Sequence, residues 1–364
     1  MENSVNHEAA AQPAARTSKV AFGGKAGEFF GIWIVNLLLS IVTLGIYSAW
    51  AKVRTNQYFY GHTRVDNQPF RYLATPIQIL KGRIIAVIIF ALFFVLSSLS
   101  PMLTLVLALA FLFVSPWLIV QSLKFNLRMT SYRNVRFAFH GEYKGAFKYF
   151  VLLPVLSIFT LYLAMPWALK KMDQYLCSNI SFGGKKLHVS TDTSTYYIAA
   201  LVAMAAIFGL MMVFGILTAV VAVIAAFSGE AAESAEGRGI FALLLSGGVF
   251  VVYFVGFALS GAVYQSMIRN HLFERTELPG IAKFKSEMKV MPYMWLILSN
   301  LLAIILTLGL AYPWTKIRKA AYMASVTTVA VYPQIDSLVD QAQNDSNAFG
   351  EEAAGLFDVD VSLA

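Results

Sequence analysis

The sequence returns three times to one pattern, in which a Thr-Leu pair ends an apolar run and a Trp follows six residues after the Leu. A basic cluster comes next, and a Tyr stands eight residues beyond the Trp. The three copies contain Thr43-Leu44, Thr160-Leu161 and Thr307-Leu308. Such self-similarity is typical of chains built from structural repeats. It predicts three pseudo-repeats, at about 19–75, 126–190 and 270–332.

Composition places the chain in a membrane. Apolar residues make up 58% of the sequence and charged residues 13%, and the mean hydropathy is +0.64. These values are typical of integral membrane proteins. The net charge of +8 fits basic loops at a membrane surface, so we expect no nucleic-acid partner. The single cysteine, Cys177, excludes an internal disulfide and a Cys-rich metal site.

The apolar runs predict four full spans, in transmembrane hairpins at about 82–125 and 196–264. The three runs that end in Thr-Leu are harder to place. If they also crossed the bilayer, several basic loops would lie on the side opposite to the others, against the positive-inside rule. Re-entrant or interfacial helical pairs, with break points at Asn36, Pro154 and Asn300, would instead leave every basic loop in the cytoplasm. We favour four spans plus three re-entrant segments, and seven simple spans remain the alternative.

Short strands are predicted next to these runs. Asp66-Asn67 forms a turn pair between alternating residues, and Gly183-Gly184 occupies the matching position in the second unit. The predicted membrane domain covers 19–332 and carries small β-hairpins on its cytoplasmic face. It lies between a flexible N-terminal tail, 1–18, and an acidic disordered tail, 333–364. The predicted fold class is therefore an all-α polytopic membrane protein.

The recurring Trp and basic residues are the first candidate site. They could bind lipid headgroups, with the three Trp-containing segments forming one positively charged ring at the membrane surface. Alternatively, they could simply anchor helices at the interface. The residues are Trp50, Lys52, Arg54, Trp167, Lys171, Trp314, Lys316 and Arg318. Two intramembrane amides, Asn36 and Asn300, could contact a solute or form hydrogen bonds between helices.

Several of these residues, in order, resemble the YjgN family of bacterial inner-membrane proteins. They are Phe22-Gly23, Asn36, the run from Thr43 to Arg54, Gly82, and the run from Thr307 to Arg318. The resemblance covers roughly residues 20–332 and implies a multi-pass bacterial inner-membrane protein, with no established activity or catalytic residue. The second unit departs from the pattern at Leu153 and Tyr162, so an Asn site would not be threefold.

No catalytic constellation is found. The five histidines lack metalloenzyme spacing, and the glycine pairs lack a phosphate-binding Lys-Ser/Thr. We therefore expect no enzyme activity, no metal and no cofactor. The predicted function is lipid handling or passage of a small solute, with membrane lipids as partners. The alternative is a non-transporting scaffold or sensor that binds a cytoplasmic protein. The oligomeric state stays open.

The charge distribution generates a prediction about sidedness. Loops around residues 64, 185 and 275 should share the cytoplasm with both termini, because each is rich in Lys or Arg. Single-cysteine variants in a Cys177→Ser background, labelled from the periplasm with an impermeant maleimide, provide the measurement. Strong labelling near residue 185 would contradict the re-entrant arrangement.

Overall fold

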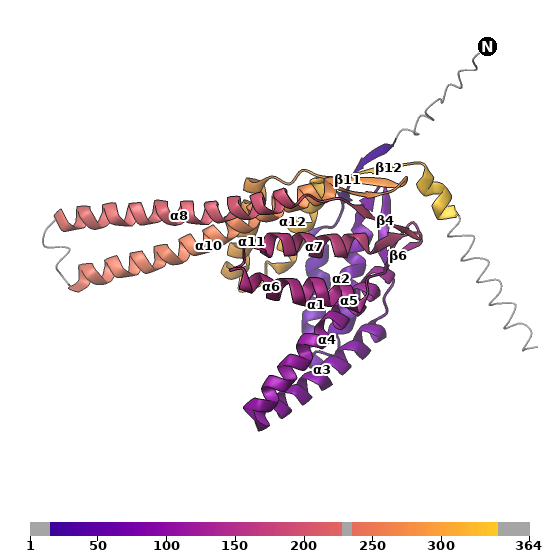
Figure 1. The fold of residues 1–364 in the computed structure, drawn as a ribbon, viewed down its shortest axis with the longest axis horizontal. Coiled ribbons are helices and arrows are strands. Elements are labelled where there is room, and N and C mark those ends of the chain that lie inside the picture. Colours follow the sequence, from indigo (N-terminus) through magenta and orange to yellow (C-terminus); the bar gives the residue numbers. More distant parts are fainter. Residues whose placement is uncertain (1–14, 228–234, 341–364) are drawn as a thin grey trace, which may run out of the picture.

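Four helices form two long pairs. The computed structural model describes residues 15–227 and 235–340. In this part, four helices are long and apolar enough to cross a membrane, as predicted. They are α3 (Pro76–Leu99), α4 (Pro101–Arg128), α8 (Thr193–Phe227) and α10 (Ala235–Glu274). Figure 1 shows α3 beside α4 and α8 beside α10, with the two pairs extending from the molecule in different directions.

These helices need lipid around them. Only 0% to 17% of the most apolar window of each is buried inside the protein. A helix that is apolar all round and unpacked is stable only in a membrane. Local signals set the turn of the first pair: Ser100 is extended, its Oγ accepts a hydrogen bond from the N–H of Met102 at 3.2 Å, and Pro101 opens α4. One residue thus separates two spans.

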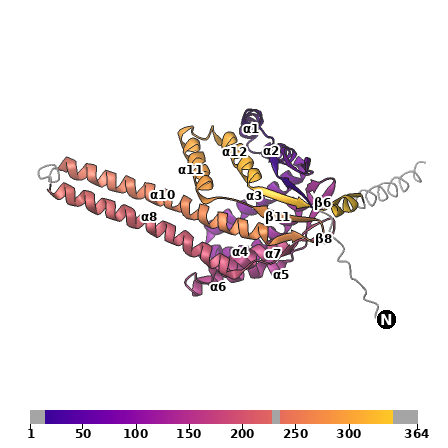
Figure 2. The ribbon, with the colours of Figure 1, turned by 90° about the horizontal axis from the view of Figure 1, so that it is seen from above.

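Three shorter helical pairs correspond to the Thr-Leu runs. The first is α1 (Ala26–Val42) with α2 (Ser48–His62), and the third is α11 (Val290–Leu306) with α12 (Tyr312–Ser325). The second combines α5 (Tyr143–Phe147), η1 (Lys148–Leu152) and α6 (Leu153–Phe159) with α7 (Met165–Ser178). At 1.5 Å per residue, α1 and α11 are about 25 Å long, shorter than a hydrocarbon core of about 30 Å. Figure 2 shows α11 and α12 on the side of α1 and α2, with α6 and α7 across the molecule.

The predicted break points are wrong. Helix α1 continues through Asn36, and α11 continues through Asn300. In the second unit a π-helical turn, η1, precedes Pro154, and the chain remains helical. A π-turn accommodates the missing N–H of proline without ending the helix. The chain reverses instead just after each Thr, in the corners that follow α1, α6 and α11.

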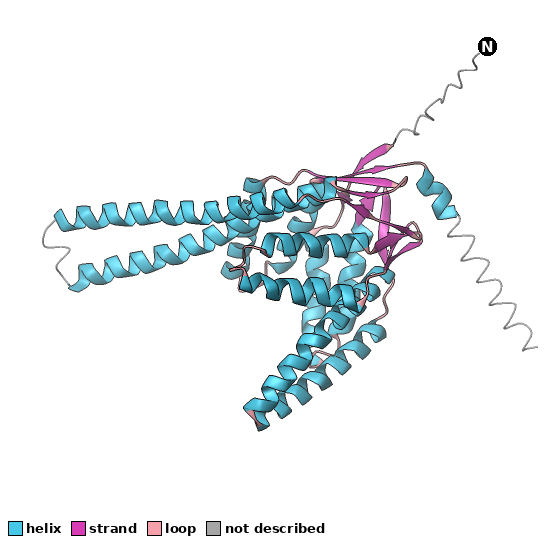
Figure 3. Cartoon of the chain, in the orientation of Figure 1, coloured by secondary structure: helices cyan, strands magenta, loops and turns pink. Residues whose placement is uncertain are grey.

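The strands gather at one end of the molecule, with the helices extending from it (Figure 3). One sheet has the order β2-β3-β4-β5-β6-β7-β8, and the other has the order β1-β12-β11-β10-β9. The strands are β1 (Arg16–Lys19), β2 (Ala21–Phe22), β3 (Thr63–Val65), β4 (Gln68–Tyr72), β5 (Thr130–Tyr132), β6 (Val135–Phe139), β7 (Ile180–Phe182), β8 (Lys185–Lys186), β9 (His188–Val189), β10 (Thr276–Leu278), β11 (Ala282–Ser286) and β12 (Thr327–Val331).

Two continuous chain segments join these sheets into a closed ring. In the segment of β1 and β2, the N–H of Val20 donates to the carbonyl of Thr327 in β12, whereas the N–H of Gly23 donates to that of His62, the residue before β3. In the segment of β8 and β9, the N–H of Leu187 donates to Ile180 of β7, whereas that of Ser190 donates to Arg275 before β10. Because N–H groups of odd and even residues point to opposite sides of a strand, each segment pairs on both sides.

The prediction of an all-α protein with small hairpins therefore understates the strands. The hairpin at Asp66-Asn67 is present, and both turn residues have positive φ, as a type I′ turn requires. The turn at Gly183-Gly184 also has positive φ at both positions. Pairing between hairpins, such as β4 with β5 and β6 with β7, converts these local elements into the ring. Such long-range pairing leaves no local mark in the sequence.

Both predicted tail boundaries also need correction. Residues 16–18, assigned to a flexible tail, form part of β1 and pair with β12. Residues 334–340, assigned to a disordered tail, are helical, with Ile335, Leu338 and Val339 buried in the same cluster as the ring interior. These three apolar side chains offset the cost of ordering the segment. The remainder of both predicted tails, 1–14 and 341–364, lies outside the described residues.

This packing predicts the effect of two truncations. A chain that ends at Tyr332 loses three buried apolar side chains and should unfold at a temperature several degrees lower than the full chain, because each such loss costs about 2 kcal/mol or more. The matched control ends at Asp340 and should retain most of the stability. Thermal unfolding in one detergent gives the comparison. Equal melting temperatures for the two truncations would show that residues 334–340 do not stabilise the ring.

Candidate functional site

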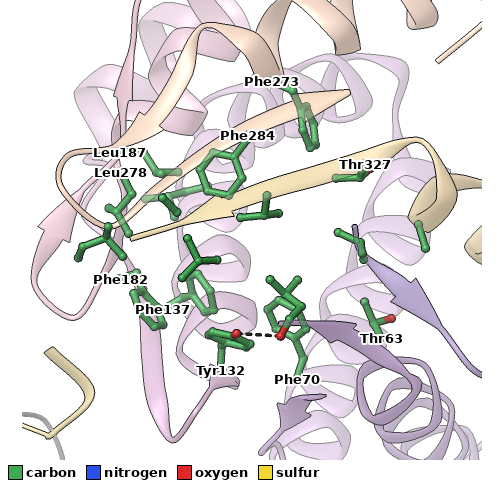
Figure 4. Close-up of a pocket in the computed structure, with 18 of the residues that line it drawn as sticks. Thr63, Phe70, Tyr132, Phe137, Phe182, Leu187, Phe273, Leu278, Phe284 and Thr327 are labelled. Atoms are coloured by element: carbon green, nitrogen blue, oxygen red, sulfur yellow. Dashed lines mark hydrogen bonds between the residues drawn. The ribbon is translucent and has the colours of Figure 1, made fainter. Parts of the chain in front are cut away.

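The strand ring surrounds a half-open cavity of about 450 Å³. Figure 4 shows its wall, with Phe70, Phe137, Phe182 and Phe284 among the labelled side chains. Apart from Thr63, Tyr132, Arg269 and Thr327, the lining is apolar. Protein interiors pack as densely as organic crystals and hold few voids larger than a water molecule. This cavity is too large to be a packing defect, and it lies within the ~300–1,000 Å³ range of small-molecule sites.

The alternation of the strands produces the apolar wall. On β12, Thr327, Val329 and Val331 are buried and line the cavity, whereas Thr328 and Ala330 between them do not. Ring closure turns one face of β3–β7 and β10–β12 inward, so their inward residues collect around one space. Sequence reasoning missed this site. The apolar residues of the short strands indicate the cavity in the sequence, but its position can be deduced only when the strand pairing is known.

The hydroxyl groups in the wall are already hydrogen bonded. Tyr132 donates to the carbonyl of Val65 at 2.9 Å, shown dashed in Figure 4. Thr63 donates to the carbonyl of Phe59 at 2.8 Å, and Thr327 donates to that of Met323 at 2.7 Å. Burial raises the pKa of Tyr132, so its hydroxyl remains a neutral donor. These groups offer little to water, and an apolar cavity of this kind favours an apolar occupant.

Helices close the cavity at one end. Arg269 and Phe273, near the end of α10, line it together with Ala320, Met323 and Ala324 of α12. The cavity thus begins where a long apolar helix enters the ring.

Ile335 of the helical segment 334–340 also lines the cavity. Asp336 holds this segment: its Oδ1 accepts from Arg133 Nη1 at 2.6 Å, and its Oδ2 accepts from Arg16 Nη2 at 2.9 Å. The Arg133 guanidinium lowers the pKa of Asp336 below its usual value. These two ion pairs, called the Asp336 clasp, join β1 and the β5–β6 turn to the C-terminal segment.

The three corners share one backbone geometry. In each, the residue two after the Thr donates its N–H to a carbonyl five residues earlier, at 2.7 or 2.8 Å: Gly45 to Ser40, Tyr162 to Ser157, and Gly309 to Ile304. The Thr hydroxyl then accepts the N–H four residues on, at 2.9 to 3.1 Å. This is a Schellman ending followed by a side-chain cap, and it satisfies backbone groups that would be costly to expose to lipid.

Each corner exposes a leucine in a strained backbone conformation. Leu44, Leu161 and Leu308 have φ of 49°, 51° and 50° and are 95%, 85% and 95% exposed. Glycine is the usual residue at this position, and an L-residue there costs about 1 kcal/mol. A strained, fully exposed leucine does not contribute to the folded core of the protein. Each of the three tips therefore exposes an apolar side chain.

The predicted Trp and basic residues begin the second helix of each pair. Trp167 and Trp314 are partly exposed, Trp50 stacks on Tyr47, and Lys52 and Lys316 are exposed. Arg54 Nη1 donates to Tyr47 Oη at 3.1 Å. Lys171 is partly buried.

Arg318 has different contacts. It stacks over Trp314, with Cζ 5.0 Å from the ring centroid, and donates to Ser299 Oγ at 2.6 Å and Asn300 Oδ1 at 3.2 Å. Arg54 and Arg318 occupy matching helix positions but have different partners.

The two predicted amides also differ. Asn300 contacts Arg318 and, through Nδ2, the carbonyl of Thr315 at 3.5 Å, so it joins the two helices of its own pair. Asn36 is 4% exposed, and neither side-chain polar atom has a hydrogen-bond partner among the described residues. Among the described residues, no hydrogen bond joins Asn36 to Asn300, so the two amides do not form a common site.

Comparisons with known proteins agree with the composition. Residues 17–356 match the family described as "Bacterial protein of unknown function (DUF898)". The chain is 26% identical to "Inner membrane protein YjgN" of Salmonella typhimurium over 354 residues, covering 85% of this chain and 88% of the relative. It is 25% identical to the protein of the same name from Escherichia coli O157:H7, covering 84% and 87%. No solved structure matches the chain.

The corner geometry predicts opposite effects for two neighbouring substitutions. Leu308→Gly should raise the free energy of unfolding by up to about 1 kcal/mol, because glycine tolerates positive φ. Leu306→Gly should lower it by a similar amount, because Leu306 is helical and glycine weakens a helix. Both leucines are exposed, at 95% and 74%, so burial contributes little to the difference. Unfolding in matched detergent micelles gives both values, and a less stable Leu308→Gly than Leu306→Gly would contradict the strain argument.

Proposed function

Because this chain belongs to the DUF898 family of bacterial proteins of unknown function, we propose its function from its own geometry: it handles membrane lipid by binding one acyl chain inside the strand ring. The observation that carries this proposal is the apolar cavity of about 450 Å³. That volume corresponds to roughly fifteen water molecules. Methylene groups are similar in size to water, so the cavity suits one chain rather than two.

The energetics fit an amphiphile that leaves the bilayer. Transferring a methylene from water to an apolar site contributes about 0.8 kcal/mol. A chain that moves from the bilayer into the ring gains little from this term, because both surroundings are apolar. The ring would therefore hold a chain that otherwise faces water, which is the requirement of a protein that extracts, senses or passes on a lipid. The apolar wall favours such a ligand over a polar solute.

The proposed membrane arrangement places the ring beside the bilayer. Each short helical pair leaves the ring and returns to it, so a shallow, re-entrant insertion leaves all strands on one side. The basic loops favour the cytoplasmic side, with both termini there. The shared corner geometry supports three pseudo-repeats. Four spans anchor this multi-pass inner-membrane protein, and the three pairs rest in one leaflet.

The basic residues give the depth of insertion. Arg54, Lys171 and Arg318 each lie six residues after the start of their helix, at Ser48, Met165 and Tyr312. That separation is about 9 Å along the axis. Interfacial helices insert about 5–10 Å, so an apolar tip at that depth would leave each cation at the headgroups. Membrane lipids are the proposed partners of the corners.

We propose this role without catalysis, cofactor or nucleic acid. Burial raises the pKa of Cys177 to about 11, so this thiol remains protonated near neutral pH and is a poor nucleophile. A sensing role is the second candidate, because Ile335 contacts the cavity from a segment clasped by Asp336. A ligand bound in the ring would contact residues 334–340 directly, and a cytoplasmic protein could bind this segment in only one of its positions.

Filling the cavity tests the proposal. Ala282 of β11 lines the ring, so Ala282→Phe should occupy part of the cavity and weaken binding of monomyristoylglycerol by roughly tenfold. The matched control is Ala330→Phe on the adjacent β12, where residue 330 does not line the cavity. Binding is measured by native mass spectrometry on the full chain in a steroid-based detergent. Absence of binding of any single-chain myristoyl amphiphile by the unmodified protein, or equal loss of monomyristoylglycerol binding in both variants, would contradict a ring-bound chain.

A further inference from the structure

Arg269 brings a positive charge to one end of the apolar cavity. Among the residues described as lining it, Arg269 is the charged one. It reaches the wall from α10, five residues before that helix ends at Glu274. Phe273 and Thr327, which Arg269 contacts, are both labelled on the wall in Figure 4.

The guanidinium is only partly satisfied by the protein. Its Nη2 donates to Thr327 Oγ1 at 2.9 Å, and its Cζ lies 4.2 Å from the centroid of the Phe273 ring. Its Nε is inaccessible to solvent and has no hydrogen-bond partner among the described residues. A guanidinium carries five N–H donors in a fixed fork that matches a carboxylate or a phosphate.

No carboxylate of the described residues neutralises this charge. None of the ion pairs between described residues includes Arg269. On β10 and β11, Glu277 pairs with Lys283 at 3.8 Å, and beyond β11 Glu287 pairs with Lys285 at 2.7 Å. A charge that is partly withdrawn from water without a counterion is unfavourable, so a bound anion would relieve it.

We propose that the ring binds a single-chain amphiphile with an anionic headgroup, whose carboxylate or phosphate pairs with Arg269 while its chain fills the cavity. This inference rests on the proposed function and adds the chemical class of the ligand. The headgroup lies at the helical end of the cavity, beside α10 and α12, and the chain extends between the strands toward Ile335. One chain per cavity favours a fatty acid or a lysophospholipid over a two-chain lipid.

The headgroup, unlike the acyl chain, allows the ring to distinguish one amphiphile from another. A chain gains little when it moves from a bilayer into the ring, whereas a charge-assisted, bidentate contact to Arg269 distinguishes an anionic amphiphile from a neutral one. The stacking of the guanidinium on Phe273 and its bond to Thr327 hold the fork in place before the ligand arrives.

Three probes with the same chain separate headgroup from chain: myristic acid, monomyristoyl lysophosphatidic acid and monomyristoylglycerol. The full chain in a steroid-based detergent should bind at least one anionic probe about tenfold more tightly than the neutral one. A preference for the carboxylate or for the phosphate probe identifies the headgroup. Equal affinity for all three overturns the role of Arg269 but leaves the chain site standing. Binding of none of them instead overturns the proposed function.

Substitutions of Arg269 test whether this residue causes the preference for an anionic headgroup. Arg269→Gln should reduce binding of the anionic probes to the level of monomyristoylglycerol, and Arg269→Lys should retain part of the preference, because the charge remains but the fork is lost. The control Arg275→Gln removes a nearby cation that pairs with Asp192 and does not line the cavity, and it should change nothing. Unchanged anion preference in Arg269→Gln overturns the proposal. If Arg269→Gln does not fold, the headgroup preference of the unmodified protein still decides.

Discussion

Closure of the strand ring is the constraint on which the rest of the structure depends. It rests on two short segments, around Val20 and Leu187, whose backbone N–H groups pair first with one strand and then with another on the opposite side. Closure removes exposed strand edges, which otherwise promote aggregation. It also turns one face of most strands inward, which creates the cavity and fixes the points where all three helical pairs leave and return. A flat sheet from the same strands would have no interior.

The sequence predicts the parts of this protein better than their assembly. The four spans and the hairpin at Asp66-Asn67 follow from local signals, namely apolar length and a turn pair of residues that tolerate positive φ. The ring does not follow, because pairing between β6 and β7, or between β1 and β12, joins residues far apart in the chain. The burial of Ile335, Leu338 and Val339 does not follow from the sequence for a related reason. Three apolar residues in an acidic stretch stabilise a helix only when the ring offers an apolar surface to pack against.

In the candidate site too, some residues can be recognised from the sequence, whereas others gain their role only from the assembled structure. Trp and basic residues at fixed distances from the Thr-Leu pairs are visible in the sequence, and the structure places each at the start of a second helix. In the sequence, Arg269 is one more basic residue near the end of an apolar run. Its importance depends on Phe273 and Thr327, and above all on the cavity that it borders. Strain at Leu44, Leu161 and Leu308 was equally hidden, because the backbone conformation of a leucine cannot be deduced from its identity.

The central claim is that an acyl chain lies inside the ring rather than along the spanning helices. Photo-crosslinking with a myristic acid that carries a diazirine near its methyl end tests this claim most directly, using the full chain and peptide mapping by mass spectrometry. The account predicts labels on β11, β12 and the segment that contains Ile335, and loss of these labels in Ala282→Phe. Labels confined to α3, α4, α8 and α10 would mean that the chain binds the outside of the membrane helices, and would contradict the account.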